Sequence, residues 1–241
     1  LDIVKKKEIG IIKIEISRNL HPDLKFLRFI RNICNKKKIV LIFDECTSGF
    51  RQTFGGLHKL YNLTPDLAVF GKSLGNGFAI TAVLGKKKIM QSSKNSFISS
   101  TFWSERVGYV AALETLKQME KTKSWEYITN QGKKIRNGWK NLAKEYNLDL
   151  DFWGLDALTG FTIVSKDSIK YKTFITQEML KNKFLASNSV YVCTAHNNEI
   201  IDNYFEFLRP IFRDISECEE GKDIDKLLDS AVCHSGFKRL N

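Results

Sequence analysis

Short apolar segments separated by polar or helical stretches constrain the fold of this chain more than any other feature. Residues 39–43, 67–70 and 80–84 are mainly apolar, a pattern typical of strands that are buried on both faces of a parallel sheet. Residues 9–16 form another such segment with partial alternation, and residues 23–36 place apolar side chains at helical spacing. Strands connected through a helix in this order predict an α/β fold with a mainly parallel sheet.

The second half of the chain follows a different pattern. Two long helical patterns cover residues 104–121 and 126–146, with a break between them. Beyond residue 148, shorter strand and helix patterns alternate, at residues 161–164, 176–186, 190–194 and 199–217. We therefore expect two domains: residues 1–120, and residues 121–241, a smaller α+β domain that includes the connecting helix.

Composition argues against several classes of function. Hydrophobic residues make up 43% of the 241 residues, enough for a core, but no run of about 18 or more is apolar, so we expect no membrane span. The net charge of +11 comes from scattered lysine clusters without interleaved aromatic residues, which we interpret as solvated surface and not as a nucleic-acid site. The 5 cysteines form no CxxC pair, which argues against a disulfide framework or a zinc site and favours a cytoplasmic protein.

Two residues suited to chemistry follow neighbouring apolar segments. Asp44 comes directly after residues 39–43, and Lys72 comes after residues 67–70 within a glycine-rich stretch. In open α/β sheets, ligands bind beyond the carboxyl ends of the strands, so both side chains are placed to meet one. A lysine that is partly desolvated becomes a nucleophile that forms Schiff bases. From these residues alone, Asp44 could equally be a helix cap and Lys72 an exposed loop lysine.

The glycine-rich stretch has two interpretations. Its glycines would let a flat ligand approach the backbone: Gly71, Gly75 and Gly77. The sequence Gly71-Lys72-Ser73 also matches the end of a phosphate-binding P-loop, but that motif requires a further glycine where this chain has Asp66. The acidic strand also precedes this motif, the reverse of the usual order. We therefore disfavour a nucleoside triphosphatase.

Three longer strings in fixed order resemble one enzyme family. They are LIFDECTSGFRQTFGG at residues 41–56, TPDLAVFGKSLGNGFAITAVLGKKKIM at residues 64–90 and FISSTFWSERVGYVAALETL at residues 97–116. They are similar to the class III aminotransferases, which depend on pyridoxal 5'-phosphate (PLP), and most to the glutamate-1-semialdehyde 2,1-aminomutase-like branch. The resemblance implies the PLP-dependent transferase fold type I, with a partial large domain that binds the cofactor and a C-terminal small domain. It also implies a homodimeric transaminase or aminomutase that acts on a small amino or carbonyl compound.

The resemblance implies roles for residues at matching positions. Lys72 would form a Schiff base with PLP and then move a proton between substrate and cofactor. Asp44 would contact the pyridine nitrogen and keep it protonated, which makes the ring an electron sink. Thr47 occupies a position that in relatives often contacts the ring hydroxyl, although they commonly carry Gln or Met there. Thr101 matches a threonine that reaches the cofactor phosphate of the neighbouring subunit.

Other residues have weaker links to the family pattern. Glu15 aligns with a strand that usually reads Glu-Pro, but Ile16 replaces the proline, so a substrate role for Glu15 or Arg18 stays a hypothesis. We expect His58 to be a surface residue of a helix and His196 to lie at the entry of the last long helix, both without a catalytic role. Three aromatic residues near the expected dimer interface either line the site or pack: Phe97, Phe102 and Trp103.

Part of the family pattern is not found in this sequence. The resemblance includes an upstream phosphate loop of glycine and small hydroxyl residues, and an aromatic residue that stacks on the pyridine ring. We therefore expect the chain to correspond to the C-terminal half of such an enzyme. Two alternatives stay open: an aminotransferase of a sugar or other carbonyl compound in surface glycan biosynthesis, and a non-catalytic interaction fragment. The presence of both Asp44 and Lys72 favours an enzyme.

Overall fold

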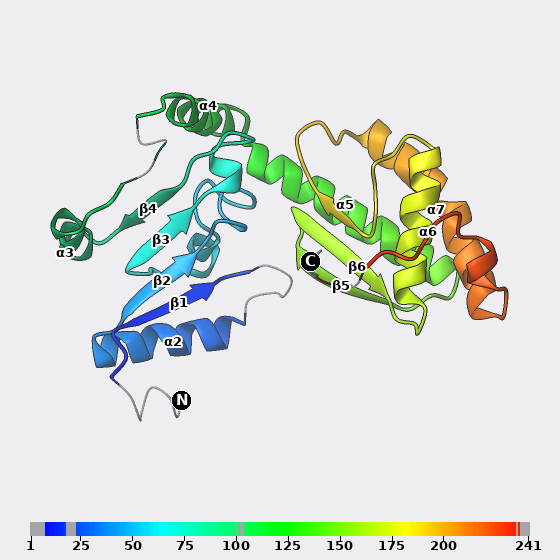
Figure 1. Cartoon of the computed structure of the whole chain (residues 1–241), viewed down its shortest axis with the longest axis horizontal. Helices are drawn as coiled ribbons and strands as arrows, with labels where there is room; N and C mark the ends of the chain where they lie inside the picture. The colour runs from blue at the N-terminus through cyan, green and yellow to red at the C-terminus, as the bar shows by residue number, and fades with distance from the viewer. Residues whose placement is uncertain (1–7, 18–22, 100, 102–103, 235, 237–241) are drawn as a thin grey trace. The chain divides into compact units, whose positions relative to one another are not determined.

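The computed structural model describes residues 8–17, 23–99, 101, 104–234 and 236. The chain forms two compact units, Leu1–Tyr127 (unit 1) and Ile128–Asn241 (unit 2). Unit 1 contains a four-stranded sheet and unit 2 a three-stranded sheet (Figure 1). The division between the units lies a few residues beyond the predicted domain boundary.

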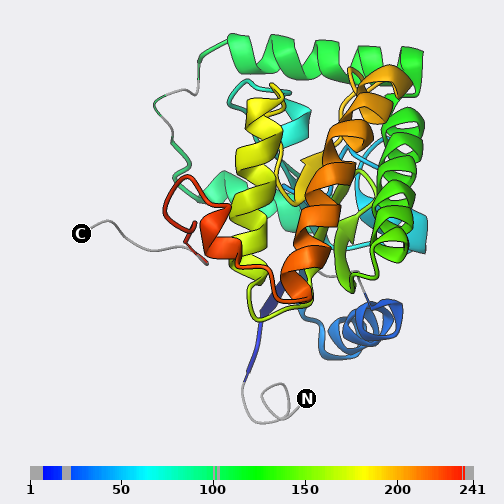
Figure 2. The ribbon, with the colours of Figure 1, turned by 90° about the vertical axis from the view of Figure 1, so that its right-hand side faces the viewer.

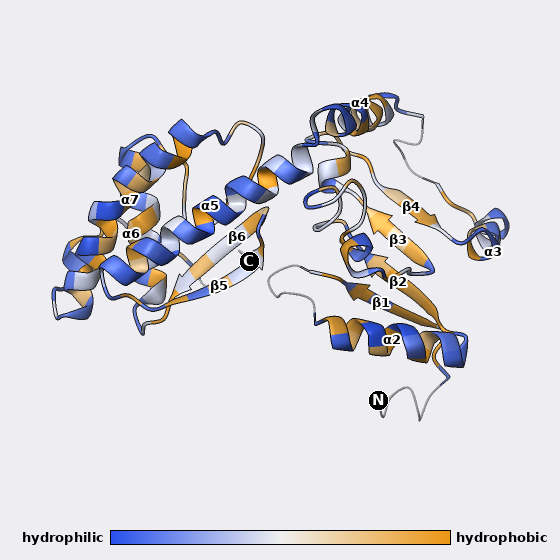
Figure 3. Ribbon diagram, turned by 180° about the vertical axis from the view of Figure 1, so that it is seen from behind, coloured by the Kyte–Doolittle hydropathy of each residue, from blue (hydrophilic) through white to orange (hydrophobic). Residues whose placement is uncertain are grey.

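The sheet of unit 1 has the strand order β1-β2-β3-β4. The strands are β1 (Ile11–Glu15), β2 (Val40–Asp44), β3 (Leu67–Phe70) and β4 (Ala82–Gly85). The first three are parallel, and β4 is antiparallel to β3 because its connection is too short for a crossover and holds only the 3-10 helix η2 (Lys72–Leu74). These strands are strongly apolar (Figure 3). The predicted α/β class with a mainly parallel sheet is confirmed.

The helix α2 (Leu24–Lys37) connects β1 to β2 and packs beside the sheet (Figure 1). It begins after Asp23, whose carboxylate accepts two backbone N–H groups of the first turn. The helix and the strand beside it contribute buried apolar residues: Leu27, Cys34, Leu41 and Phe43. Because side chains alternate along a strand, Ile42 and Asp44 of β2 lie on the opposite face from Leu41 and Phe43.

The remainder of unit 1 is helical. The 3-10 helix η1 (Leu57–Tyr61) follows β2. The helices α3 (Lys87–Met90), η3 (Gln91–Asn95) and α4 (Val107–Thr122) follow β4. The helix α4 ends at Lys123, which has a φ of 48°, and α5 (Ser124–Glu145) begins immediately after it. This is the break that the sequence predicts between two long helices. Val110 and Leu113 of α4 are exposed.

Unit 2 combines an antiparallel sheet with long helices. Its elements after α5 are β5 (Leu150–Leu155), β6 (Leu158–Ile163), α6 (Ser168–Lys181), β7 (Ser189–Tyr191), α7 (Asn198–Glu219) and η4 (Ile224–Lys226). Figure 2 shows α6 and α7 side by side. In the core, the ring of Phe161 in β6 contacts the rings of Trp139 in α5 and Phe212 in α7, and all three residues are 0% exposed. Trp139 also donates a hydrogen bond from Nε1 to the hydroxyl of Tyr204, 2.9 Å away.

Two elements of unit 2 differ from the prediction. A helix is confirmed at residues 176–181, but its predicted bounds of 176–186 are wrong, because α6 begins eight residues earlier, at Ser168, and ends before Lys183, which has a φ of 66°. Its buried side chains share one face: Tyr171, Phe174, Ile175 and Met179. The strand β5 was not predicted. It is defined by its pairing with β6, where the ring of Trp153 lies directly over Gly160.

Candidate active site

Asp44 ends β2 at the carboxyl edge of the parallel strands. Its Oδ1 accepts the N–H of Cys46 at 3.1 Å, and its Oδ2 forms an ion pair with the Nζ of Lys13 at 2.9 Å. Burial would raise the pKa of Asp44, but the Lys13 ammonium and the Cys46 N–H outweigh burial and hold that pKa below its ordinary value. The carboxylate is therefore kept ionised, and 20% of the side chain stays accessible to a ligand.

Lys72 follows β3 at the same edge of the sheet, where η2 begins. Its backbone φ is 43°, in the left-handed region that residues other than glycine rarely adopt. Such a conformation costs about 1–3 kcal/mol and clusters at functional sites, where the surrounding structure holds it. The side chain is exposed, and its Nζ donates a hydrogen bond to Oγ1 of Thr47 at 2.9 Å.

Two hydrogen bonds in series connect Lys72 to β1. Thr47 accepts from Lys72 and donates from its Oγ1 to Oε1 of Glu15, also at 2.9 Å. A hydroxyl has one hydrogen, so donation to Glu15 leaves the Thr47 oxygen to accept from the lysine. Thr47 is only 5% exposed, which limits the directions its hydroxyl can take. The structure thus brings together three of the residues that the sequence singles out.

Lys13 is the site residue that sequence reasoning missed. Its Nζ lies 2.9 Å from Asp44 Oδ2, and this carboxylate raises the pKa of Lys13 above its ordinary value. The strands β1 and β2 pair in parallel with Glu15 opposite Asp44, and strand alternation places Lys13 on the same face as Glu15. The available signal was the alternation of charged residues at positions 13 and 15 within an otherwise apolar segment.

The loop after β2 is held by a buried carboxylate. Glu45 is 0% exposed: its Oε2 accepts from Ser48 Oγ at 2.6 Å and from the Leu57 N–H at 2.8 Å. Its Oε1 accepts from the His58 N–H at 3.0 Å and lies 2.7 Å from His58 Nδ1. The prediction that His58 is a surface residue is therefore wrong, because its ring turns inward and only 16% of the side chain is exposed. This network fixes the segment that carries Thr47.

The glycines beside Lys72 serve the local turn more than a ligand. A Cβ at Gly75 would lie 2.0 Å from the carbonyl oxygen of Phe78, and Gly77 has a φ of 108°. Both positions therefore require glycine for the backbone path itself. Gly71 differs, because an added Cβ would make ordinary contacts, 3.4 Å from Thr81 and 3.5 Å from Cys46.

The other predicted residues lie elsewhere. Thr101 is in an exposed turn, and among the described residues it makes no hydrogen bond to Asp44 or Lys72. Phe97 is 97% exposed. His196 lies in the turn before α7, as expected; its Nδ1 accepts the Cys193 N–H at 3.2 Å, and burial lowers its pKa. Three candidate residues lie outside the described residues: Arg18, Phe102 and Trp103.

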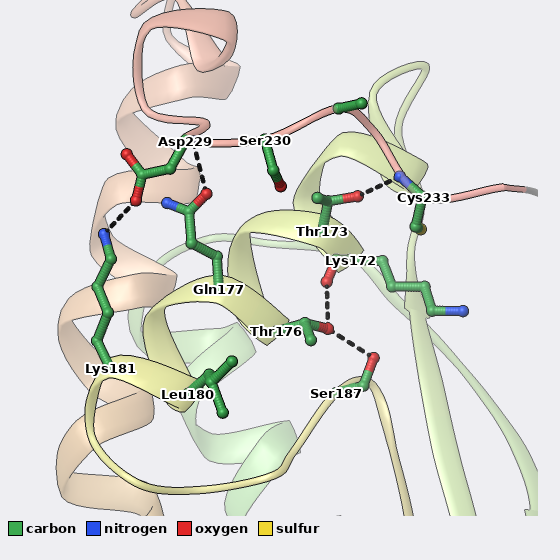
Figure 4. Close-up of a pocket in the computed structure, with 11 residues that line it drawn as sticks. Lys172, Thr173, Thr176, Gln177, Leu180, Lys181, Ser187, Asp229, Ser230 and Cys233 are labelled. Atoms are coloured by element: carbon green, nitrogen blue, oxygen red, sulfur yellow. Dashed lines mark hydrogen bonds and ion pairs between the residues drawn. The ribbon is translucent and has the colours of Figure 1, made fainter.

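Unit 2 contains a separate pocket of about 720 Å³ between α6 and the C-terminal segment 229–233 (Figure 4). Its polar groups bond to one another: Lys181 with Asp229 at 2.8 Å, Thr176 with Ser187 at 3.0 Å, and the Cys233 N–H with Thr173 at 3.0 Å. The contacts of Asp229 and Cys233 hold the C-terminal segment against α6. We therefore do not assign this pocket to the reaction.

Three further observations limit the kinds of site present. All five cysteines lie among the described residues and are free thiols. The described residues contain no group of three or more His, Cys, Asp or Glu that could hold a metal ion. None of the described helices has both the length and the apolar character needed to cross a membrane.

Comparison with known sequences gives consistent matches. The model of the family described as Aminotransferase class-III matches residues 19–204. The 3-aminobutyryl-CoA aminotransferase of Cloacimonas acidaminovorans (strain Evry) is 31% identical over 202 residues, which cover 81% of this chain and 49% of that protein. The glutamate-1-semialdehyde 2,1-aminomutase of Methanosphaera stadtmanae is 30% identical over 221 residues, covering 82% and 51%. The chain spans about half the length of the curated relatives it matches.

Solved structures share the fold at low sequence identity. The FumI protein of Sphingopyxis sp. MTA144, in its PLP internal aldimine form, has a TM-score of 0.83 and 21% identity, covering 93% of this chain and 56% of that one. A transaminase with PLP bound has a TM-score of 0.80 and 20% identity, covering 91% and 56%. The predicted fold of PLP-dependent transferases is confirmed. With a family match over most of its length, the chain belongs to the class-III aminotransferases.

Proposed function

We propose that this protein is a PLP-dependent aminotransferase or aminomutase in which Lys72 binds the cofactor covalently and Asp44 contacts its ring nitrogen. One observation carries the proposal: an ionised carboxylate and a primary amine lie at the carboxyl edge of adjacent parallel strands. Cofactors bind at such an edge in α/β folds. Membership of the class-III family supports the reaction class.

The residues present fit two of the chemical groups of PLP. A pyridine nitrogen that is to stay protonated needs an ionised acceptor, and the lowered pKa of Asp44 meets that need. An aldehyde needs an amine that can reach it, and the exposed side chain of Lys72 provides one. For the phosphate, the resemblance offers Thr101, which would serve the cofactor of a second subunit in a homodimer.

When bound, PLP supplies an aldehyde that condenses with amines and a protonated ring that stabilises negative charge on the substrate. Asp44 keeps the proton at the ring nitrogen by presenting a negative charge to it. Lys72 acts as acid and base, removing a proton at one carbon atom and returning it at another. Thr47 orients the Lys72 amine through the hydrogen bond that its oxygen accepts.

The substrate is proposed as a small amino or carbonyl compound. The similarity to glutamate-1-semialdehyde 2,1-aminomutases supports the aminomutase reaction, and the similarity to 3-aminobutyryl-CoA aminotransferase supports transfer between two substrates. The residues described above serve both reactions, because both need a proton carrier and an electron sink.

Trapping the cofactor tests the role of Lys72. The protein is mixed with a limiting amount of PLP, reduced with borohydride and mapped by peptide mass spectrometry. We expect the label on Lys72, lost in Lys72→Ala and retained in Lys25→Ala, which removes an exposed lysine of α2. A label found mainly on another lysine of the unaltered protein would exclude Lys72 as the cofactor-binding residue.

A further inference from the structure

The strand β1 contributes two oppositely charged side chains to the candidate site. Lys13 and Glu15 lie two positions apart on one face of β1, with Glu15 opposite Asp44 in the parallel register. Lys13 forms the ion pair with Asp44 at 2.9 Å, and Glu15 accepts from Thr47, which accepts from Lys72. Each of the two proposed cofactor-binding groups is thus bonded, directly or through Thr47, to a β1 residue of opposite charge.

The two proposed cofactor-binding groups are themselves of opposite charge. Asp44 and Lys72 follow neighbouring strands, and both act on the thiol of Cys46: burial and Asp44 raise the pKa of Cys46, whereas Lys72 lowers it. Two opposite charges that both reach one side chain attract each other. If they formed a direct ion pair, Asp44 would be bonded to the amine that is proposed to react, and that amine would be held in its charged, non-nucleophilic form.

We propose that Lys13 and Glu15 are positioning residues that keep the Asp44 carboxylate and the Lys72 amine from pairing with each other, so that the amine stays available to a cofactor. The inference rests on the proposed function of Asp44 and Lys72. Lys13 satisfies the charge of Asp44 from the β1 side. Glu15 fixes the Thr47 hydroxyl so that its oxygen faces the lysine. Neither residue needs to contact the reacting atoms.

The surroundings of Asp44 define what a pH measurement would report. The charged groups from β1 are Lys13 and Glu15, the loop after β2 contributes the Cys46 thiol, and the β3 edge contributes Lys72. The register partner of Asp44 on β3 is Val69, which is apolar. In this structure Asp44 is bonded to Lys13 and Lys72 is bonded to Thr47, so a change of partner at Asp44 would appear as a change in its pKa.

A cycle of variants of the full 241-residue chain tests the proposal without cofactor. The pKa of Asp44 is measured by carboxyl ¹³C NMR, with the signal assigned from Asp44→Asn. It is compared in the unaltered chain, Lys13→Met, Lys72→Met and the double variant. We expect Lys72→Met to leave this pKa nearly unchanged when Lys13 is present. In the Lys13→Met background, where Lys72 pairs with Asp44, Lys72→Met should raise it.

Controls separate positioning from a general change in charge. In the Lys13→Arg background, as in the unaltered chain, Lys72→Met should hardly change the Asp44 pKa. Lys25→Met, which removes an exposed charge from α2, should not make the Asp44 pKa depend on Lys72. Glu15→Ala, which removes the acceptor of the Thr47 hydroxyl, should make the Asp44 pKa depend on Lys72, whereas Glu8→Ala should not. Lys13 and Glu15 are both exposed, so their replacement leaves the core intact.

The outcomes also separate this inference from the proposed function. An equal effect of Lys72→Met on the Asp44 pKa with and without Lys13 would overturn the positioning role, and so would an effect of Lys13→Met no larger than that of Lys25→Met. The proposed function would be unaffected, because it depends on where borohydride fixes PLP. Conversely, trapping of PLP on another lysine would contradict the proposed function, but the effect of Lys72 and Lys13 on the Asp44 pKa would remain valid.

Discussion

Unit 1 and unit 2 each join a sheet to helices, but they bury their apolar residues to different degrees. In unit 2 a single cluster of buried side chains connects α5, β6, α6 and α7, with Trp139, Phe161 and Phe212 near its centre. In unit 1 large apolar side chains are exposed on β1 and α4, including Ile11 at 60% and Leu113 at 69%. The unit that carries the candidate site is thus the less completely buried of the two.

This difference indicates that different interactions stabilise the fold of each unit. Unit 2 depends mainly on hydrophobic burial, which is cooperative and insensitive to pH. Unit 1 supplements a smaller core with buried carboxylates that accept several hydrogen bonds each, Glu45 after β2 and Asp66 before β3. Such networks specify the path of the loops next to the site, and they are costly to break on one side.

The largest effect is expected in the core of unit 2. Trp139→Ala removes a fully buried ring and leaves the Tyr204 hydroxyl without its donor, so the free energy of unfolding should fall by about 4 kcal/mol. Trp125 of unit 1 is partly buried, and its replacement by alanine should cost about 1 kcal/mol. Urea unfolding followed by circular dichroism measures both. Equal losses would remove the contrast between the units.

A somewhat smaller effect is expected from the buried network of unit 1. Glu45→Ala leaves the N–H groups of Leu57 and His58 and the Ser48 hydroxyl without their acceptor, so unfolding should become easier by about 3 kcal/mol. The exposed Glu8 is the matched control, and Glu8→Ala should change this free energy by less than about 0.5 kcal/mol. Hydrogen exchange should also increase at residues 57 and 58. A loss no larger than that of Glu8→Ala would show that the network does not hold the loop.

The smallest effect concerns acid stability, and it should arise in unit 1. Burial would raise the pKa of Asp66, but the Leu41 N–H, Lys86 and Arg31 outweigh it and lower that pKa. A carboxyl whose pKa is lower in the folded state stabilises the fold fully above its unfolded value of about 4 and loses this contribution as the pH falls through the folded value.

Asp66→Asn should therefore flatten the decline in the free energy of unfolding below about pH 4. Asp151→Asn, at an exposed position of unit 2, should leave the decline unchanged. Urea unfolding at a series of pH values measures both variants. If the unaltered protein and Asp66→Asn decline in parallel, the acid sensitivity has another origin.

The sequence by itself determined the α/β class, the family and the positions of Asp44 and Lys72. Apolar segments such as residues 67–70 predict strands because a strand that is buried on both faces must be apolar throughout. Residues that directly follow such strands therefore lie at the carboxyl edge of the sheet. The same local reasoning misplaced α6 by eight residues, because it did not show which apolar side chains would share the buried face.

Only the tertiary structure decided what these residues bond to. The partner of Asp44 is Lys13, and the partner of Glu45 is His58. The local sequence pattern alone had predicted that the His58 ring lies at the surface. Both contacts depend on which segments become neighbours in space, since β1 had to pair in register with β2 before Lys13 and Glu15 could reach the site. Local propensity carries no information about register, which is set by side-chain packing across the whole sheet.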